Sequence, residues 1–200
     1  KYHPMSFFTI AEIFTSFHKI NCLTSAQTTY DEKGRTVGIA RAKKWTKYDF
    51  YDYNYKWIQQ ESTVWRKSLW KKAGNCINTD LKYAGDLELW LRFFRHDELY
   101  ITSGLIGGFR QRSADQLSLD FLDRYIVEAE SCIKKELLSD RDTGILKNYK
   151  QFKKVTTFLN KTIILRTSRF RHNFEKKYLK KTPDIIFNRL TQKFELKQTM

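Results

Sequence analysis

Apolar residues recur every three or four positions along several stretches of the chain, and this spacing predicts helices. From Met5 to Phe17 they form one broad face, which suits a short helix packed on a core. From Asp86 to His96 they occupy more than one side, so that helix should be largely buried. Further helices are predicted from about Leu119 to Leu138 and from Lys67 to Lys72, where Gly74-Asn75 would end the second.

Segments rich in β-branched residues predict strands. Ile20 to Thr29 is one such segment, and Thr36 to Ile39 is another. Between them, Asp31 to Arg35 has the composition of a turn, so we expect a hairpin there. Leu99 to Phe109 contains a further β-rich patch.

The segment from Trp45 to Tyr55 is crowded with Tyr, Phe, Asp and Asn, and it follows neither a period of 2 nor one of 3.6. We interpret it as a loop. Aromatic rings beside carboxylates and amides are typical of carbohydrate sites, where ring faces stack on the sugar and polar groups bind hydroxyls. An aromatic loop packed onto the core is the equally open alternative.

Composition indicates a folded chain. The 200 residues are 41% hydrophobic, enough to bury a core, and the apolar runs are too short to span a bilayer. Cys22, Cys76 and Cys132 lie more than fifty residues apart, without the close pairing of a zinc or redox motif. We interpret them as reduced structural thiols in a reducing compartment.

The net charge of +15 is concentrated near the C-terminal end. Residues 147–200 hold fifteen Lys or Arg against three Asp or Glu, so residues 1–146 carry only +3. Apolar residues from Val155 to Ile163 and from Phe170 to Tyr178 recur at helical spacing among these lysines, which predicts basic amphipathic helices. Such helices could simply pack on the main domain with a solvated basic face, or attach to an anionic membrane surface. Nucleic acid is disfavoured, because no recognisable binding module accompanies the charge.

Two carboxylates, Asp86 and Glu88, stand at the mouth of the otherwise apolar helix that begins near Gly85. An acid at a helix N-terminus is stabilised by the free backbone N–H groups and the helix dipole. Asp86 could therefore be an ordinary cap. A functional carboxylate is the competing interpretation.

A series of motifs bears on that choice. It consists of Trp57–Arg66 (WIQQESTVWR), Leu69–Gly74 (LWKKAG), Tyr83–Arg92 (YAGDLELWLR), the dipeptide Phe109-Arg110 and the tripeptide Gln116–Ser118. In this order and at these spacings the series resembles family 2 glycosyltransferases. The resemblance covers roughly Trp57 to Ser118.

The resemblance implies an α/β protein with part of a GT-A fold, containing a mixed sheet. Residues 1–145 would be the acceptor-side part of a glycosyltransferase domain, and residues 146–200 a basic amphipathic helical tail. The implied reaction is an inverting transfer of a sugar from a nucleotide-sugar donor to a saccharide or lipid-linked acceptor, as in polysaccharide biosynthesis.

Asp86 matches the family's catalytic base, which takes the proton of the attacking acceptor hydroxyl. Glu88 would orient Asp86 or bind the acceptor. By the same resemblance, acceptor-binding positions are Glu88, Gln60, Glu61 and Trp57, and Arg110 and Arg112 would approach the donor diphosphate.

The sequence also departs from the family pattern. Gly85 and Glu88 replace the family's more usual residues, and the histidine that often follows the F-R element is missing, so we expect no metal site in this chain. The Mg²⁺ or Mn²⁺ of the parent enzyme would be bound by aspartates that precede a segment resembling Lys1–Met5. The chain alone should therefore turn over little or nothing.

The expected location is cytoplasmic, peripheral on the inner face of the cell membrane. A sheet edge and an apolar face left by the missing half would favour a homodimer. The alternative function is a non-catalytic binding module for a glycan, nucleic acid or protein, in which Asp86 is only a helix cap.

Overall fold

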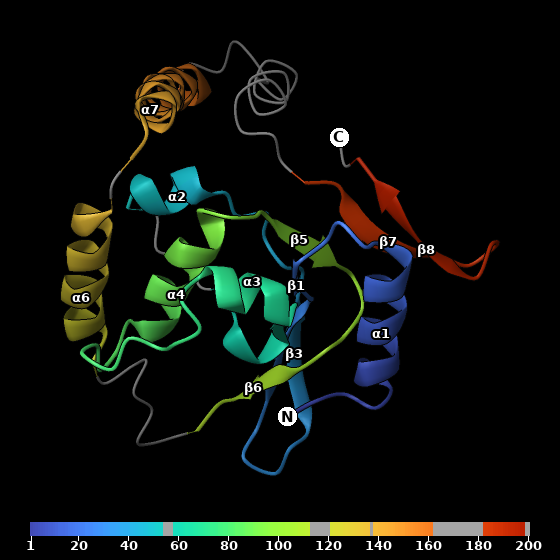
Figure 1. Cartoon of the computed structure of the whole chain (residues 1–200). Coiled ribbons are helices and arrows are strands. Elements are labelled where there is room, and N and C mark those ends of the chain that lie inside the picture. The colour runs from blue at the N-terminus through green and yellow to red at the C-terminus, as the bar shows by residue number, and fades with distance from the viewer. Residues whose placement is uncertain (54–57, 113–120, 137, 162–181, 199–200) are drawn as a thin grey trace.

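The computed structural model describes residues 1–53, 58–112, 121–136, 138–161 and 182–198. Over these residues the chain is an α/β protein with two mixed sheets, which confirms the α/β class (Figure 1). Both sheets combine parallel and antiparallel neighbours.

The larger sheet has five strands in the order β4-β1-β5-β7-β8. The second strand in this order is β1 (Cys22–Thr24), which pairs antiparallel with β4 (Thr63–Trp65) and parallel with the central strand β5 (Leu99–Thr102). On the far side of β5, the strand β7 (Asp184–Asn188) runs parallel and forms a hairpin with β8 (Lys193–Lys197). All three residues of β1 are buried, as expected for a strand covered on both faces.

The smaller sheet has the order β3-β2-β6. The predicted hairpin is confirmed: β2 (Gln27–Tyr30) and β3 (Thr36–Ala40) are antiparallel neighbours, and β6 (Gly108–Arg110) pairs parallel with β2. The segment expected to be one strand from Ile20 to Thr29 is two strands in different sheets, β1 and β2. The chain crosses from one sheet to the other after Thr24, where the next backbone N–H, that of Ser25, bonds Ser62.

Helices cover both sides of the sheets (Figure 1). The helix α1 (Ser6–Ser16) packs on one side, where a small aliphatic core includes Ile13, Leu23 and Ile185. On the other side lie α3 (Lys67–Lys72), α4 (Gly85–Phe94) and α6 (Leu122–Lys135), around a larger aromatic core. These four helices fall where the sequence predicts them, and Gly74, with φ 99°, ends α3.

The aromatic segment is not the expected loop. It contains a short helix, α2 (Lys47–Tyr51), which begins at a reciprocal cap in which the Thr46 backbone N–H donates to the Asp49 carboxylate at 2.9 Å. Tyr48, Phe50 and Tyr51 are buried, so these rings pack in the core, as the alternative interpretation expected.

The C-terminal region also differs from the expected helical tail. The helix α7 (Asp140–Lys161) begins before the expected boundary at residue 146, and residues 184–197 form the β7–β8 hairpin, not a helix. Strand pairing wins because Ile185 is completely buried beside β5, a contact that a separate helix would lose. The predicted helical stretch from Phe170 to Tyr178 lies outside the described residues.

Gly107 generates a testable prediction. A Cβ at this position would lie 2.1 Å from the backbone carbonyl oxygen of Glu61, so Gly107→Ala must push two segments apart. We expect a loss of about 1–3 kcal/mol in the free energy of unfolding, measured by urea denaturation. The matched control is Gly144→Ala in α7, where a Cβ meets nothing and should stabilise by about 0.5–1 kcal/mol. Equal stability of Gly107→Ala and the wild type would contradict the close approach.

Candidate functional site

Asp86 occupies the first turn of α4 and is largely withdrawn from solvent. Its Oδ1 accepts a 2.7 Å hydrogen bond from the Leu87 backbone N–H. Burial raises the pKa of the Asp86 carboxyl above its usual value, and the negative charge of Glu61 raises it further against the lowering effect of the backbone N–H groups. The Asp86 carboxyl is thus partly shielded from solvent, and its carboxylate is more basic than usual.

Glu61 reaches this place from a separate element, the 3-10 turn η1 (Gln60–Ser62) that precedes β4. The turn is held from two sides. The Ser25 backbone N–H donates to the Ser62 carbonyl at 3.0 Å, and the Gln59 Nε2 donates to the Thr28 carbonyl at 3.1 Å. The absence of a side chain at Gly107 lets the Glu61 backbone approach closely. These contacts fix the turn that carries Glu61.

The backbone just before α4 is held from another helix. The Glu128 carboxylate of α6 accepts hydrogen bonds from three successive backbone N–H groups, those of Lys82, Tyr83 and Ala84, at 3.1, 2.8 and 2.9 Å. Although partial burial raises it, the three N–H bonds lower the pKa of Glu128 overall. Glu128 therefore positions the segment that leads into α4, whereas the N–H of Leu87 within the first turn bonds Asp86.

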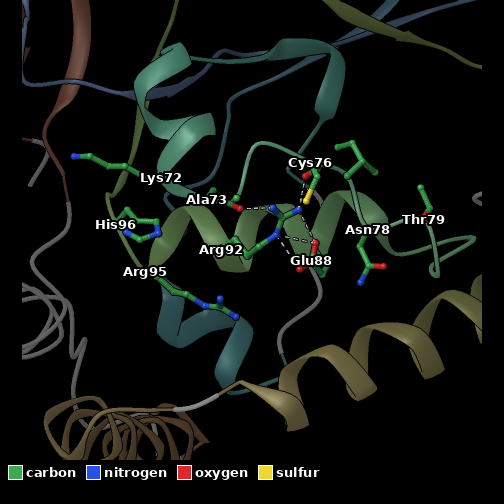
Figure 2. Close-up of a pocket in the computed structure, with 11 residues that line it drawn as sticks. Lys72, Ala73, Cys76, Asn78, Thr79, Glu88, Arg92, Arg95 and His96 are labelled. Carbon is green, nitrogen blue, oxygen red and sulfur yellow. Dashed lines mark hydrogen bonds and ion pairs between the residues drawn. The ribbon is translucent and has the colours of Figure 1, made fainter.

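Glu88 has a different environment from Asp86. Both of its carboxylate oxygens bind the Arg92 guanidinium, with Nε at 2.9 and 3.0 Å and Nη2 at 2.9 Å (Figure 2). Arg92 also donates to the carbonyl oxygens of Ala73 and Cys76. The pair therefore fastens the α3–α4 loop onto α4. No hydrogen bond joins Glu88 to Asp86 among the described residues, so its predicted role toward Asp86 or the acceptor stays a prediction.

An open hollow of about 550 Å³ adjoins the Glu88–Arg92 pair (Figure 2). Its lining includes Lys72, Asn78, Arg95 and His96, but neither Asp86 nor Glu61. Two arginines in this lining already form ion pairs: Arg92 pairs with Glu88, and Arg95 pairs with Glu136 at 2.6 Å. We therefore place the candidate site at Asp86 and Glu61, because burial makes the Asp86 carboxyl more basic and no ion pair neutralises it among the residues that the structure describes.

The remaining predicted residues are dispersed. Gln60 is exposed next to Glu61, which suits a surface contact. Arg110 and Arg112 are exposed at the end of β6, where the Gln111 backbone N–H holds the chain to the Tyr30 carbonyl at 2.8 Å. Trp57 lies outside the described residues.

The role of Glu128 could not be predicted from the sequence, because its position within a predicted amphipathic helix gives no sign that it binds the backbone before α4, about 45 residues earlier. The role of Gly107 was equally hidden, since a glycine in a β-rich patch does not reveal which segment approaches it.

Among the described residues, no group of three or more His, Cys, Asp or Glu side chains could hold a metal ion. Within the same part of the chain, no helix combines the length and apolarity needed to cross a bilayer. Comparison with family models gives no match, and comparison with curated proteins gives none either.

Asp86→Asn tests the electrostatics of this position. Because the pKa of Asp86 is raised in the folded state, ionisation of this group disfavours folding at neutral pH, and the cost disappears as the pH falls through the raised pKa. We expect Asp86→Asn to raise the free energy of unfolding by about 0.5–2 kcal/mol over the wild type at neutral pH. This gain should vanish in acid. Urea denaturation at several pH values measures both effects.

The matched control for that experiment is Asp49→Asn. The Asp49 carboxylate accepts a hydrogen bond from the Thr46 backbone N–H and so caps the start of α2. Removing its charge should lower the free energy of unfolding by about 1 kcal/mol. If Asp86→Asn destabilised the protein in the same way, Asp86 would be a structural cap.

Glu88→Gln tests the structural pair. The Arg92 side chain is only 11% exposed, so removing its charged partner leaves a poorly solvated guanidinium. We expect a loss of about 1–3 kcal/mol, with faster amide hydrogen exchange in residues 73–79. Unchanged exchange in that loop would show that the pair does not fasten it.

Proposed function

We propose that the chain is the acceptor-side portion of a family 2 glycosyltransferase, with part of a GT-A fold and with Asp86 as general base. The observation that supports this proposal best is the environment of Asp86 in the first turn of α4. Burial raises the pKa of this carboxyl, and the charge of Glu61, from a separate motif of the series, adds a smaller effect in the same direction. A carboxylate that served only as a helix cap would be stabilised in its charged form.

The chemistry requires a base at the acceptor hydroxyl. In the proposed transfer the acceptor oxygen forms a bond to the anomeric carbon of the donor sugar, while the bond from that carbon to the diphosphate oxygen breaks. The acceptor proton passes to Asp86, and the nucleoside diphosphate leaves. The burial that raises the pKa of Asp86 makes its carboxylate a stronger base.

Glu61 and Gln60 would bind acceptor hydroxyls beside that base. The 3-10 turn that carries them is held by backbone hydrogen bonds, and such a rigid support suits positioning. Arg110 and Arg112 would donate to the diphosphate of the donor, for which exposed guanidinium groups at the end of β6 are available.

A divalent metal is expected in the parent enzyme, where it would neutralise the charge of the leaving diphosphate. The described residues offer no group to hold it, and the roles derived above are those of this chain's own side chains.

The enzyme would act at the cytoplasmic face of the membrane, on a saccharide or lipid-linked acceptor. Self-association also stays a prediction. Met5, Phe7 and Phe8 are exposed at the start of α1, which is the kind of apolar surface that an association would cover.

Sugar-transfer activity tests the proposal. A panel of nucleotide-sugar donors with Mn²⁺ would be assayed with this chain, with a version extended upstream of Lys1, and with the extended Asp86→Asn variant. We expect activity in the extended form and a loss of about 10²–10⁴-fold on Asp86→Asn, the usual contribution of a general base. Because Asp86 must be ionised, kcat/KM should rise with pH through its raised pKa.

The control is Asp80→Asn, the same chemical change at an exposed position in the loop before α4, which should leave the activity unchanged. An extended enzyme indifferent to Asp86→Asn would reduce Asp86 to a structural residue. An extended protein that neither transfers nor hydrolyses any donor would favour the binding module.

A further inference from the structure

The basic helix α7 packs on α2 through polar contacts, in which charged side chains of α7 that face α2 are paired. Asp142 accepts a 2.8 Å hydrogen bond from the Tyr48 hydroxyl and pairs with Lys47 at 2.6 Å. Near the middle of α7, Lys153 pairs with Asp52 of the α2 segment. The inner side of the helix is therefore both anchored and electrically matched.

The solvent side of α7 is different. Lys147, Lys150 and Lys154 follow one another at helical spacing i, i+3 and i+7, so they form a single stripe on the helix. All three are exposed, and none forms an ion pair within the described part of the chain. At 1.5 Å per residue the stripe is about 10 Å long. Figure 1 places α7 at the periphery of the molecule, beside α2.

We propose that this lysine stripe attaches the protein to the surface of an anionic lipid bilayer. The inference supplies the surface for the membrane location proposed above, and its test is independent of glycosyltransferase activity. Clustered lysines at a surface are attracted to acidic headgroups, and each adds to the binding within a Debye length of the membrane. The stripe belongs to the sequence region 147–200, which holds fifteen Lys or Arg against three acids, so the net charge of that region has the same sign.

The structure favours lipid over nucleic acid. Proteins that bind single strands without sequence preference combine a basic groove with exposed aromatic rings on which bases stack. On α7, Tyr149 is turned the other way: it packs against the aromatic core, and its hydroxyl donates to Asp49 at 3.1 Å. Val155, 49% exposed, is the apolar side chain that α7 presents to solvent in its described part. A stripe of lysines along one side of a helix suits a planar headgroup surface.

Vesicle co-sedimentation tests the proposal with the full chain. Phosphatidylcholine vesicles with and without phosphatidylserine would be mixed with the wild type and with the triple variant Lys147→Gln, Lys150→Gln and Lys154→Gln. We expect binding only to the phosphatidylserine vesicles, weakening with salt. Loss of three lysines should lower the partition coefficient on the order of 100-fold.

The matched control removes three exposed lysines from α3, with Lys67→Gln, Lys71→Gln and Lys72→Gln, so that the net charge changes equally. It should keep most of the binding. Far-UV circular dichroism would establish that both variants remain folded.

Three results would overturn the proposal. These are equal binding to neutral vesicles, equal loss in the α3 control, and unchanged binding of the folded α7 variant. A fluorescent oligonucleotide assayed at matched phosphate concentration provides the remaining comparison. Tighter binding to the oligonucleotide than to the vesicles, lost in the α7 variant, would reassign the stripe to nucleic acid.

Discussion

The rest of the fold depends on the pairing of β1 on both of its edges. Its three residues are buried, so their backbone N–H and C=O groups cannot be satisfied by water and must bond to neighbouring strands. The neighbours are β4 and β5, and both lead directly to the candidate site. Glu61 lies in the turn that enters β4, and Gly107 follows β5 in the chain, so the β1 ladder brings together the two segments that meet at the Glu61 carbonyl.

Three carboxylates near α4 have three different environments, and the difference decides what each can do. Glu128 accepts hydrogen bonds from backbone N–H groups, and Glu88 is paired with a guanidinium. Asp86 has less compensation: burial and a second acid act against its charge, and local backbone N–H groups offset them only in part. A protein retains such a position at a cost in stability, which is why Asp86 is a better candidate for chemistry than its two neighbours.

Sequence pattern predicts the parts of this fold whose information is local. The helices α1 and α4 follow from apolar spacing, and the hairpin around Gly34 follows from its turn residues. The pattern fails where a distant partner decides the outcome. Ile185 belongs to a strand because it pairs with the buried Thr102 of β5, 83 residues earlier, although the lysines of this region predict a solvated helix. Likewise, the effect of the Glu61 charge on Asp86 depends on the fold that positions their elements, whereas the resemblance could supply only their separate identities.

The β7–β8 hairpin has a consequence for how the protein is made. Of the described residues these strands leave the ribosome last, yet Thr182 bonds the carbonyl of Leu99, and Asp184 pairs with Arg41, 143 positions away. The larger sheet can therefore close only when synthesis has passed them. Until then the edge of β5 is unpaired and could pair with a strand of another nascent chain. We therefore expect the incomplete polypeptide to bind chaperones during synthesis.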